Sequence, residues 1–287
     1  MAAIHRDGGR AAAAASASTT ADTALVVSVS LLFGIAAAWV AWELSRTTDG
    51  IDQVYGQGPA EGPWGPHSAP IDWCETNYKR HALVAELWNT SSSALYVFVG
   101  VLGLLARGRT KVSPMHTQYQ LALITTGIFS ALFHATLWWW AQKLDEIAET
   151  VMVVTLLYAG PDSRLRSRVH GGLAAAGIVC IPFAFAELHL VGVVSLVVRD
   201  VVRHLQRARG DAKCAEAHAA LQAHAVRGCY AGLVGFAAWL GDKVACVHVE
   251  PLQLHSVWHV GTALAMHYAG RAACSRYRLR LATGLRV

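Results

Sequence analysis

Long apolar runs alternate with short polar connections along most of the chain. A transmembrane helix needs about 20 apolar residues to cross the hydrocarbon core of a bilayer, and several of the runs approach that length. The runs cover residues 24–42, 82–105, 119–140, 147–160, 171–186, 188–202, 230–247 and 254–273. The last seven follow one another closely. The pattern therefore predicts an all-α membrane protein, a seven-transmembrane helix bundle with an additional N-terminal hydrophobic helix.

A stretch rich in glycine and proline, residues 49–70, separates the first run from the others. Such a composition interrupts regular helix and marks a boundary. We therefore expect an N-terminal segment with a signal-anchor or targeting helix (1–45), a loop (46–80), a seven-helix bundle (81–275) and a basic tail (276–287). The alanine- and serine-rich start also fits a transit peptide.

The composition agrees with a membrane protein. Hydrophobic residues make up 54% of the chain and charged residues only 15%, whereas a soluble domain carries roughly 25% charged residues. The net charge of +5 would also suit a nucleic-acid partner, but the basic residues lie in small clusters between apolar runs, as in cytoplasmic loops. We therefore expect an integral membrane protein with no nucleic-acid partner, and the sequence identifies no protein partner.

The basic residues also predict an orientation. Clusters of arginine and lysine follow the second, fourth and sixth apolar runs and occupy the C-terminal tail. The other connections of the bundle carry at most a single lysine, such as Lys143 or Lys243. The positive-inside rule then places the C-terminus in the cytoplasm and the loop 46–80 on the lumenal side.

Four polar residues lie in or beside the apolar segment 129–146, namely Ser130, His134, Asp145 and Glu146. Ser130 and His134 are four residues apart and share a helix face, while the two acids open the next predicted helix at the same depth. These residues alone fit two interpretations. Either the histidine hydrogen-bonds a neighbouring helix and the acids cap one, or costly polar groups at membrane depth mark a functional site.

A histidine pair near the start of the last predicted helix favours the functional site. His255 and His259 are four residues apart, a spacing that brings two imidazoles together as helical zinc sites require. The predicted orientation puts this pair and His134 at the same lumenal depth. We therefore expect His134, His255 and His259 to bind zinc (Zn2+) and to leave a fourth position for water, as in catalytic zinc sites.

Ser130 and Asp145 are the candidate catalytic partners of this site. Zinc lowers the pKa of a bound water towards about 7, and we expect Asp145 to take up the proton of that water as a general base. Ser130 is expected to donate a hydrogen bond to the developing oxyanion. The alternative is a nucleophilic serine, for which no fourth histidine is placed as a base.

A second polar cluster precedes the bundle. Asp72, Glu75 and Asn77 lie within six residues of one another, and Glu86 follows at the start of the next predicted helix. Oxygen ligands in a flexible loop are what calcium (Ca2+) prefers, although the spacing is not that of an EF-hand. The alternative is an acidic loop that caps a helix at the membrane surface.

Five sequence blocks together resemble the alkaline ceramidases, which belong to the CREST superfamily of membrane hydrolases. The blocks are DWCETNY, AELWNTSS, FSALFHATLWWWAQKLDE, WLGDKVAC and LQLHSVWH, and they occur in family order between residues 72 and 259. The resemblance extends over roughly residues 64–275. The chain departs from the family pattern in its N-terminal apolar run.

The resemblance implies a metal-dependent ceramidase, which cleaves the amide of ceramide to a sphingoid base and a free fatty acid in a membrane such as that of the endoplasmic reticulum or Golgi. The residues it implies are zinc ligands His134, His255 and His259, catalytic Ser130 and Asp145, calcium ligands Asp72, Trp73 (through its main chain), Glu75, Asn77 and Glu86, and a lumenal disulfide between Cys74 and Cys246. A non-enzymatic, receptor-like member of the same superfamily is the alternative.

Overall fold

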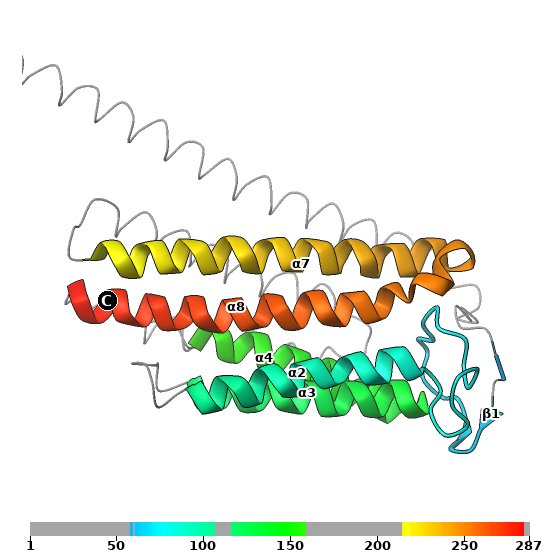
Figure 1. Ribbon diagram of the computed structural model, residues 1–287. Coiled ribbons are helices and arrows are strands. Elements are labelled where there is room, and N and C mark those ends of the chain that lie inside the picture. The colour runs from blue at the N-terminus through cyan, green and yellow to red at the C-terminus, as the bar shows by residue number, and fades with distance from the viewer. Residues whose placement is uncertain (1–57, 60, 107–115, 159–213, 284–287) are drawn as a thin grey trace, which may run out of the picture.

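The computed structural model describes residues 58–59, 61–106, 116–158 and 214–283. Within these ranges the chain is mostly helical, as the apolar pattern predicts (Figure 1). The predicted helices at 24–42, 171–186 and 188–202 lie outside the described residues. The elements are β1 (Glu61–Gly62), β2 (Gly65–Pro66), α2 (Leu87–Ala106), α3 (His116–Thr136), α4 (Trp139–Tyr158), α7 (Ala215–Val249), the short 3-10 helix η4 (Glu250–Leu252) and α8 (Leu254–Thr283).

The long helices run side by side. Helix α7 packs along α8, α2 packs along α3 and also against α8, and α3 packs on α4 (Figure 1). A shared core of aromatic and aliphatic side chains joins α2, α3, α4 and α8, and it includes Tyr96, Val99, Tyr119, Leu123, Met152, Val153 and Ala263. By length and composition, α2 and the stretch Ala215–Leu252 are able to cross a membrane.

Two glycines bring α7 and α8 into close contact. A Cβ atom added at Gly261 would lie 2.6 Å from the Cα atom of Gly235, a distance that real Cβ atoms do not adopt. Small residues allow helix backbones to approach closely, which is a common basis of helix packing in membranes. The pairing of these two helices matters for the site, because α8 carries His255 and His259.

The predicted helix at 119–140 is wrong in one respect, because the chain breaks at Leu137. Leu137 has a left-handed backbone (φ 51°) between α3 and α4. Its carbonyl accepts hydrogen bonds from the backbone N–H groups of Ser68 (3.1 Å) and Ala69 (3.0 Å). The hydroxyl of Ser68 accepts a bond from the N–H of Trp139 at 2.9 Å, so it caps the start of α4. Hydrogen bonds with the loop that contains Ser68 and Ala69 therefore stabilise the break between α3 and α4.

Because of this break, Asp145 and Glu146 do not lie at the start of a helix, where the sequence predicted them. Helix α4 begins at Trp139, so Asp145 and Glu146 lie in its second turn and do not open it. Helices α7 and α8 are also longer than the apolar runs that predicted them, since α7 begins at Ala215 and α8 continues to Thr283. The added turns contain polar residues that an apolar run does not include.

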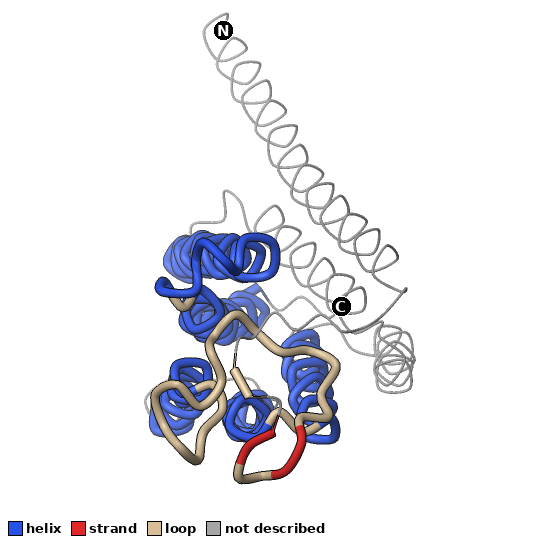
Figure 2. Tube along the Cα trace, turned by 90° about the vertical axis from the view of Figure 1, so that its right-hand side faces the viewer, coloured by secondary structure: helices blue, strands red, loops and turns tan. Residues whose placement is uncertain are grey.

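The loop before α2 covers one end of the helices (Figure 2). It begins with the hairpin β1–β2, whose strands pair Glu61 with Pro66. The indole N–H of Trp138 donates to the carbonyl of Trp64 at 3.0 Å, and the two rings meet edge to face. A small core that includes Ala85, Phe133 and Leu137 then holds the loop against the ends of α3 and α4.

Candidate metal centre

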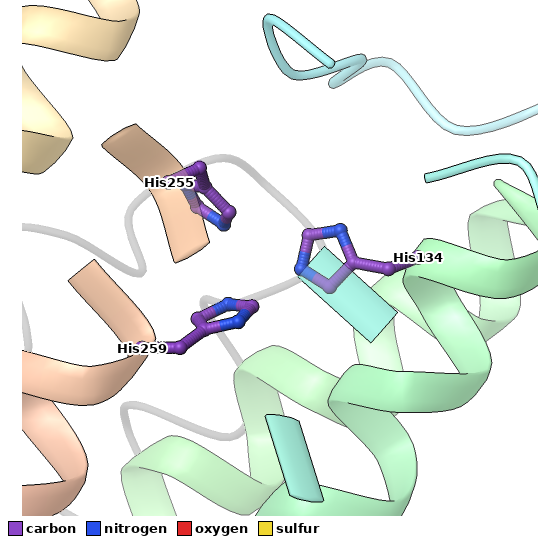
Figure 3. A group of neighbouring side chains, drawn as sticks. All are labelled: His134, His255 and His259. Atoms are coloured by element: carbon purple, nitrogen blue, oxygen red, sulfur yellow. The ribbon is translucent and has the colours of Figure 1, made fainter. Parts of the chain in front are cut away.

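Three histidines from two helices converge beneath this loop. His134 comes from α3, and His255 and His259 come from α8 (Figure 3). Each offers a ligand atom, and these atoms all lie within 4.8 Å of one another. All three side chains are buried, with exposed fractions of 1%, 4% and 3%. Three buried imidazole nitrogens this close together form a donor set that suits zinc.

His134 lies in the last turn of α3, where the helix leaves carbonyl groups without intrahelical partners. The backbone N–H of Glu86 donates to the carbonyl of His134 at 3.0 Å, and that of Ala85 donates to Ala135 at 3.1 Å. The Nδ1 atom of His134 is hydrogen-bonded to the Glu86 carboxylate. This bond fixes the ring and leaves Nε2 for a metal, the arrangement in which a carboxylate orients a metal-binding histidine.

His255 and His259 are placed by a tight turn between α7 and α8. Gln253 has a left-handed backbone (φ 51°) after η4, which reverses the chain direction just before α8. Its carbonyl accepts the N–H groups of Ser256 (3.0 Å) and Val257 (3.3 Å) in the first turn of α8. The two histidines therefore begin a new helix directly opposite the end of α3.

Helix α2 holds the ring of His259. The Nδ1 atom of His259 lies 2.8 Å from the hydroxyl of Ser92 and 3.2 Å from the carbonyl of Asn89. With Nδ1 engaged in this way, Nε2 is the atom of His259 available to a metal. Ser92 and Asn89 are not among the predicted site residues. Their only sequence signal is their position one turn apart in the block AELWNTSS, because the contact itself joins residues 167 and 170 positions apart.

The ring of His255 is held by stacking. The indole of Trp73 lies parallel to it, with ring centroids 3.8 Å apart and an interplanar angle of 21°. The Nδ1 atom of His255 is buried and has no hydrogen-bond partner among the described residues. An unpaired buried nitrogen beside two other imidazoles fits a metal ligand. The resemblance assigned Trp73 only a main-chain role, and the stacked side chain is an addition from the structure.

Ser130 and Asp145 lie beside the histidines and contact each other. Ser130 is buried one turn before His134 on α3, and its hydroxyl accepts a hydrogen bond from Ser93 at 3.1 Å. The Ser93 hydroxyl also lies 3.4 Å from Nδ1 of His259. The Asp145 carboxyl group of α4 interacts with Ser130, and its Oδ1 atom has no hydrogen-bond partner among the described residues. A buried acceptor without a partner is suited to a water or substrate proton.

The acidic loop brings its oxygen atoms together next to the histidines. The amide nitrogen of Asn77 donates to both carboxylate oxygens of Asp72, at 3.1 and 2.9 Å. Burial and, to a smaller extent, the nearby charge of Glu86 together raise the pKa of Asp72 to about 8. The Oδ1 atom of Asn77 is buried and lacks a partner among the described residues. Crowded acids beside an unpaired oxygen fit a cation such as calcium.

Glu75 also caps a helix, as the alternative interpretation of the acidic loop expects. Its carboxylate accepts the N–H groups of Trp88 (2.8 Å) and Asn89 (3.0 Å) in the first turn of α2. Burial raises the pKa of Glu75, although these two N–H groups oppose the shift. Each carboxylate oxygen can accept more than one bond, so Glu75 retains capacity for an ion.

Glu86 connects the loop with the histidine cluster. One of its carboxylate oxygens accepts the backbone N–H of Trp73 at 2.9 Å, while the other accepts the His134 bond and the amide of Asn89 at 3.3 Å. A disulfide joins Cys74 of the loop to Cys246 of α7, with Cα atoms 5.3 Å apart. The acidic loop is therefore attached to α2, α3 and α7 at the same end of the molecule.

The described part of the chain thus defines a class: a helical protein with three buried histidines that could hold a metal ion and an adjacent serine and acid, as in metal-dependent hydrolases. The family model described as Ceramidase matches residues 65–278, which include every residue of both clusters. The chain belongs to the alkaline ceramidase family. The expectation of a ceramidase-type hydrolase is confirmed.

Individual relatives agree with this assignment. The chain is 28% identical to the alkaline ceramidase of Arabidopsis thaliana over 213 residues, which cover 69% of this chain and 79% of the relative. It is 24% identical to the alkaline ceramidase YPC1 of Saccharomyces cerevisiae over 249 residues, or 75% and 78% of the two chains. A shorter match to alkaline ceramidase 3 of Mus musculus is 37% identical over 87 residues, or 30% and 33%. The family and the apolar helices together indicate a membrane-associated protein.

Proposed function

We propose that this chain is a zinc-dependent intramembrane amidase that hydrolyses ceramide to a sphingoid base and a free fatty acid. The observation that carries the proposal is the convergence of His134, His255 and His259 on one buried point. Family membership supports the substrate and favours the hydrolase over a receptor-like protein. A lipid substrate also suits a site whose ligands come from helices that are apolar enough for a membrane.

The reaction requires a water oxygen to form a bond to the amide carbon and the C–N bond to break. A zinc ion in such a site supplies a Lewis acid and an acidified water. Asp145 takes up the water proton and later delivers it to the departing amine of the sphingoid base. Ser130 donates its hydroxyl proton towards the oxygen of the former carbonyl, where negative charge develops. The fatty acid is then released with the water oxygen in its carboxyl group.

The acidic loop supplies a calcium site in the same proposal. Asp72, the main-chain carbonyl of Trp73, Glu75, Asn77 and Glu86 would provide its oxygen ligands. The unpaired Oδ1 of Asn77 and the crowding of Asp72 with Glu86 support this role. Calcium would neutralise those acids and stabilise the loop whose Glu86 holds His134.

The proposed topology is a seven-span bundle preceded by one N-terminal hydrophobic helix, with the metal site near the lumen and the C-terminus in the cytoplasm. The loop and the disulfide lie at one end of α7 and α8, and the C-terminal end of α8 lies at the other (Figure 1). The halves of α7 and α8 towards that other end carry exposed or half-buried Arg227, Arg271 and Arg278, which the positive-inside rule favours on a cytoplasmic side. An oxidising compartment such as the endoplasmic reticulum or Golgi suits the disulfide.

The direct test is release of fatty acid from ceramide by the purified, detergent-solubilised protein, combined with metal analysis. His259→Ala is expected to abolish release and to reduce bound zinc, because it removes one of three ligands. His267→Ala is the matched control. This histidine lies two turns further along α8, is only half-buried and is expected to leave both values unchanged.

Active protein without bound zinc, or full activity in His259→Ala, would contradict the proposal. Retained zinc with no release from any ceramide would leave the metal site in place but reject the substrate.

A further inference from the structure

We propose that Asp242 is a positioning residue for the metal centre, holding His255 and the acidic loop in register with each other. Asp242 lies on α7 and is 2% exposed. One of its carboxylate oxygens accepts the backbone N–H of His255 and the other accepts that of Cys74, each at 3.2 Å. The inference deepens the proposed function and rests on it, since it concerns the affinity of the same zinc site.

His255 depends on this contact more than the other two histidines depend on any single bond. Glu86 holds the ring of His134, and Ser92 and Asn89 hold the ring of His259. The Nδ1 atom of His255, by contrast, has no hydrogen-bond partner among the described residues. Its position is set by its backbone, through the N–H bonded to Asp242, and by the stacked ring of Trp73.

The same carboxylate also bonds the backbone next to the stacked indole, while Glu86 bonds the N–H of Trp73 itself. Trp73 precedes Cys74, whose N–H is the second donor to Asp242. One side chain therefore fixes both the backbone of the ligand and the backbone next to the indole that covers the ligand ring. Cys246, four residues after Asp242 on α7, holds Cys74 covalently through the disulfide. The two residues attach the loop to α7 on either side of a local distortion at Ala245 (φ −128°, ψ 21°).

The chemistry of the bond explains why an acid is present. His255 is the second residue of α8, where backbone N–H groups have no intrahelical partner. A buried carboxylate can accept from two separate N–H groups at once, and its charge strengthens both bonds. An asparagine of the same shape has one acceptor oxygen and one donor NH2, so it would face one of the two N–H groups with a donor.

A purely structural role, the capping of α8 and the attachment of the loop, makes a different prediction. Glu250 provides the comparison. It also ties the region after α7 to the loop, through bonds from Thr76 (3.1 Å) and Lys79 (3.4 Å), but no bond to a histidine is among its contacts. If Asp242 acted only by attaching the loop, loss of Asp242 and loss of Glu250 would change the zinc affinity to the same extent.

The experiment measures zinc affinity in the full-length, detergent-solubilised protein after metal removal, by competition with a fluorescent zinc chelator. Asp242→Asn is expected to weaken zinc binding by about 10- to 100-fold, the range for loss of a residue that orients a metal ligand. Saturating zinc is expected to restore kcat, with KM unchanged. Glu250→Gln is expected to keep the zinc affinity of the unaltered protein.

The inference is overturned if Asp242→Asn binds zinc as tightly as the unaltered protein, or if Glu250→Gln weakens binding to the same extent. If Asp242→Asn does not fold, Asp242→Glu serves instead. It keeps the charge but displaces the carboxylate, so zinc affinity should fall at a retained melting temperature, and an unchanged affinity overturns the inference. Failure of the unaltered protein to bind zinc would instead reject the proposed function.

Discussion

At the scale of single residues, the candidate metal centre is built from side chains that hydrogen-bond to one another although they are far apart in the sequence. Ser130 contacts Ser93 of α2 and Asp145 of α4, so its hydroxyl sits between the acid and the residues that hold His259. This position suits a donor to an oxyanion. No histidine nitrogen is recorded as a hydrogen-bond partner of Ser130 in the described part of the chain, as a serine nucleophile would require.

Ser130→Ala is therefore expected to lower kcat by about 10²- to 10³-fold while leaving KM unchanged, because the lost bond forms in the transition state. Steady-state release of fatty acid from a short-chain ceramide measures both constants. Ser91→Ala is the control, since Ser91 is exposed on α2 and bonds only its own helix at Leu87. A trapped acyl-serine at residue 130 would show that the hydroxyl is a nucleophile instead.

Asp72→Asn tests the calcium site apart from the zinc site. Asp72 is bonded to Asn77 and interacts with Glu86, and within the described part of the chain it makes no hydrogen bond to a histidine. Removing one carboxylate is expected to raise the calcium concentration needed for stimulation about tenfold or more, because the number of charged ligands tunes affinity. Activity without calcium should persist. Glu61→Gln, in the exposed hairpin, is the control, and stimulation identical to that of the unaltered protein would reject Asp72 as a ligand.

The grouping of the three histidines could be predicted from the sequence, because the histidine spacing and the five blocks are local signals. The residues that support them could not. Ser92 and Asn89 have ordinary neighbours in the sequence and acquire their roles only when α2 meets α8. Trp73 was expected to contribute its main chain, but not the ring that stacks on His255. A contact between residues more than a hundred positions apart leaves no local pattern to read.

At the scale of helices, the apolar pattern predicted the existence of α2, α3, α7 and α8 but not all of their ends. The run that includes Trp138, Trp139 and Trp140 contains no proline, and its one glycine, Gly127, lies ten residues before Leu137, so nothing near Leu137 indicates the break. That break depends on the loop at Ser68 and Ala69. The polar first turns of α7 were not expected as part of a spanning helix because a search for apolar runs does not detect them.

The close contact of α7 with α8 gives a prediction at this scale. Gly261→Ala is expected to lower the melting temperature of the solubilised protein, with a loss of about 1–3 kcal/mol, because the added methyl group meets the backbone of Gly235. Thermal unfolding followed by circular dichroism measures the change. Gly232→Ala is the control, since its added Cβ would lie 3.7 Å from Ala265, an ordinary contact. Equal melting temperatures for the two variants would contradict this account of the packing.

At the scale of the whole molecule, the disulfide closes a very long segment of chain. Cys74 and Cys246 are separated by 172 residues, and cross-links that close long segments restrict the unfolded chain most. Cys246→Ser is expected to cost about 2–4 kcal/mol of stability and to increase proteolysis of the loop before α2. Cys229→Ser is the control, because Cys229 is an exposed free thiol on the same helix. Unchanged melting and proteolysis in Cys246→Ser would show that the hydrogen bonds of the loop suffice.

Helices α7 and α8 contain 35 and 30 residues. At about 1.5 Å per residue they are about 52 and 45 Å long, well beyond the roughly 30 Å of a bilayer interior. In the proposed topology the histidines lie near the lumenal surface, so the excess length would emerge on the cytoplasmic side. An antibody or protease confined to the cytosol would therefore first meet a paired helical stalk, about 15–20 Å tall, in place of a flat rim of loops.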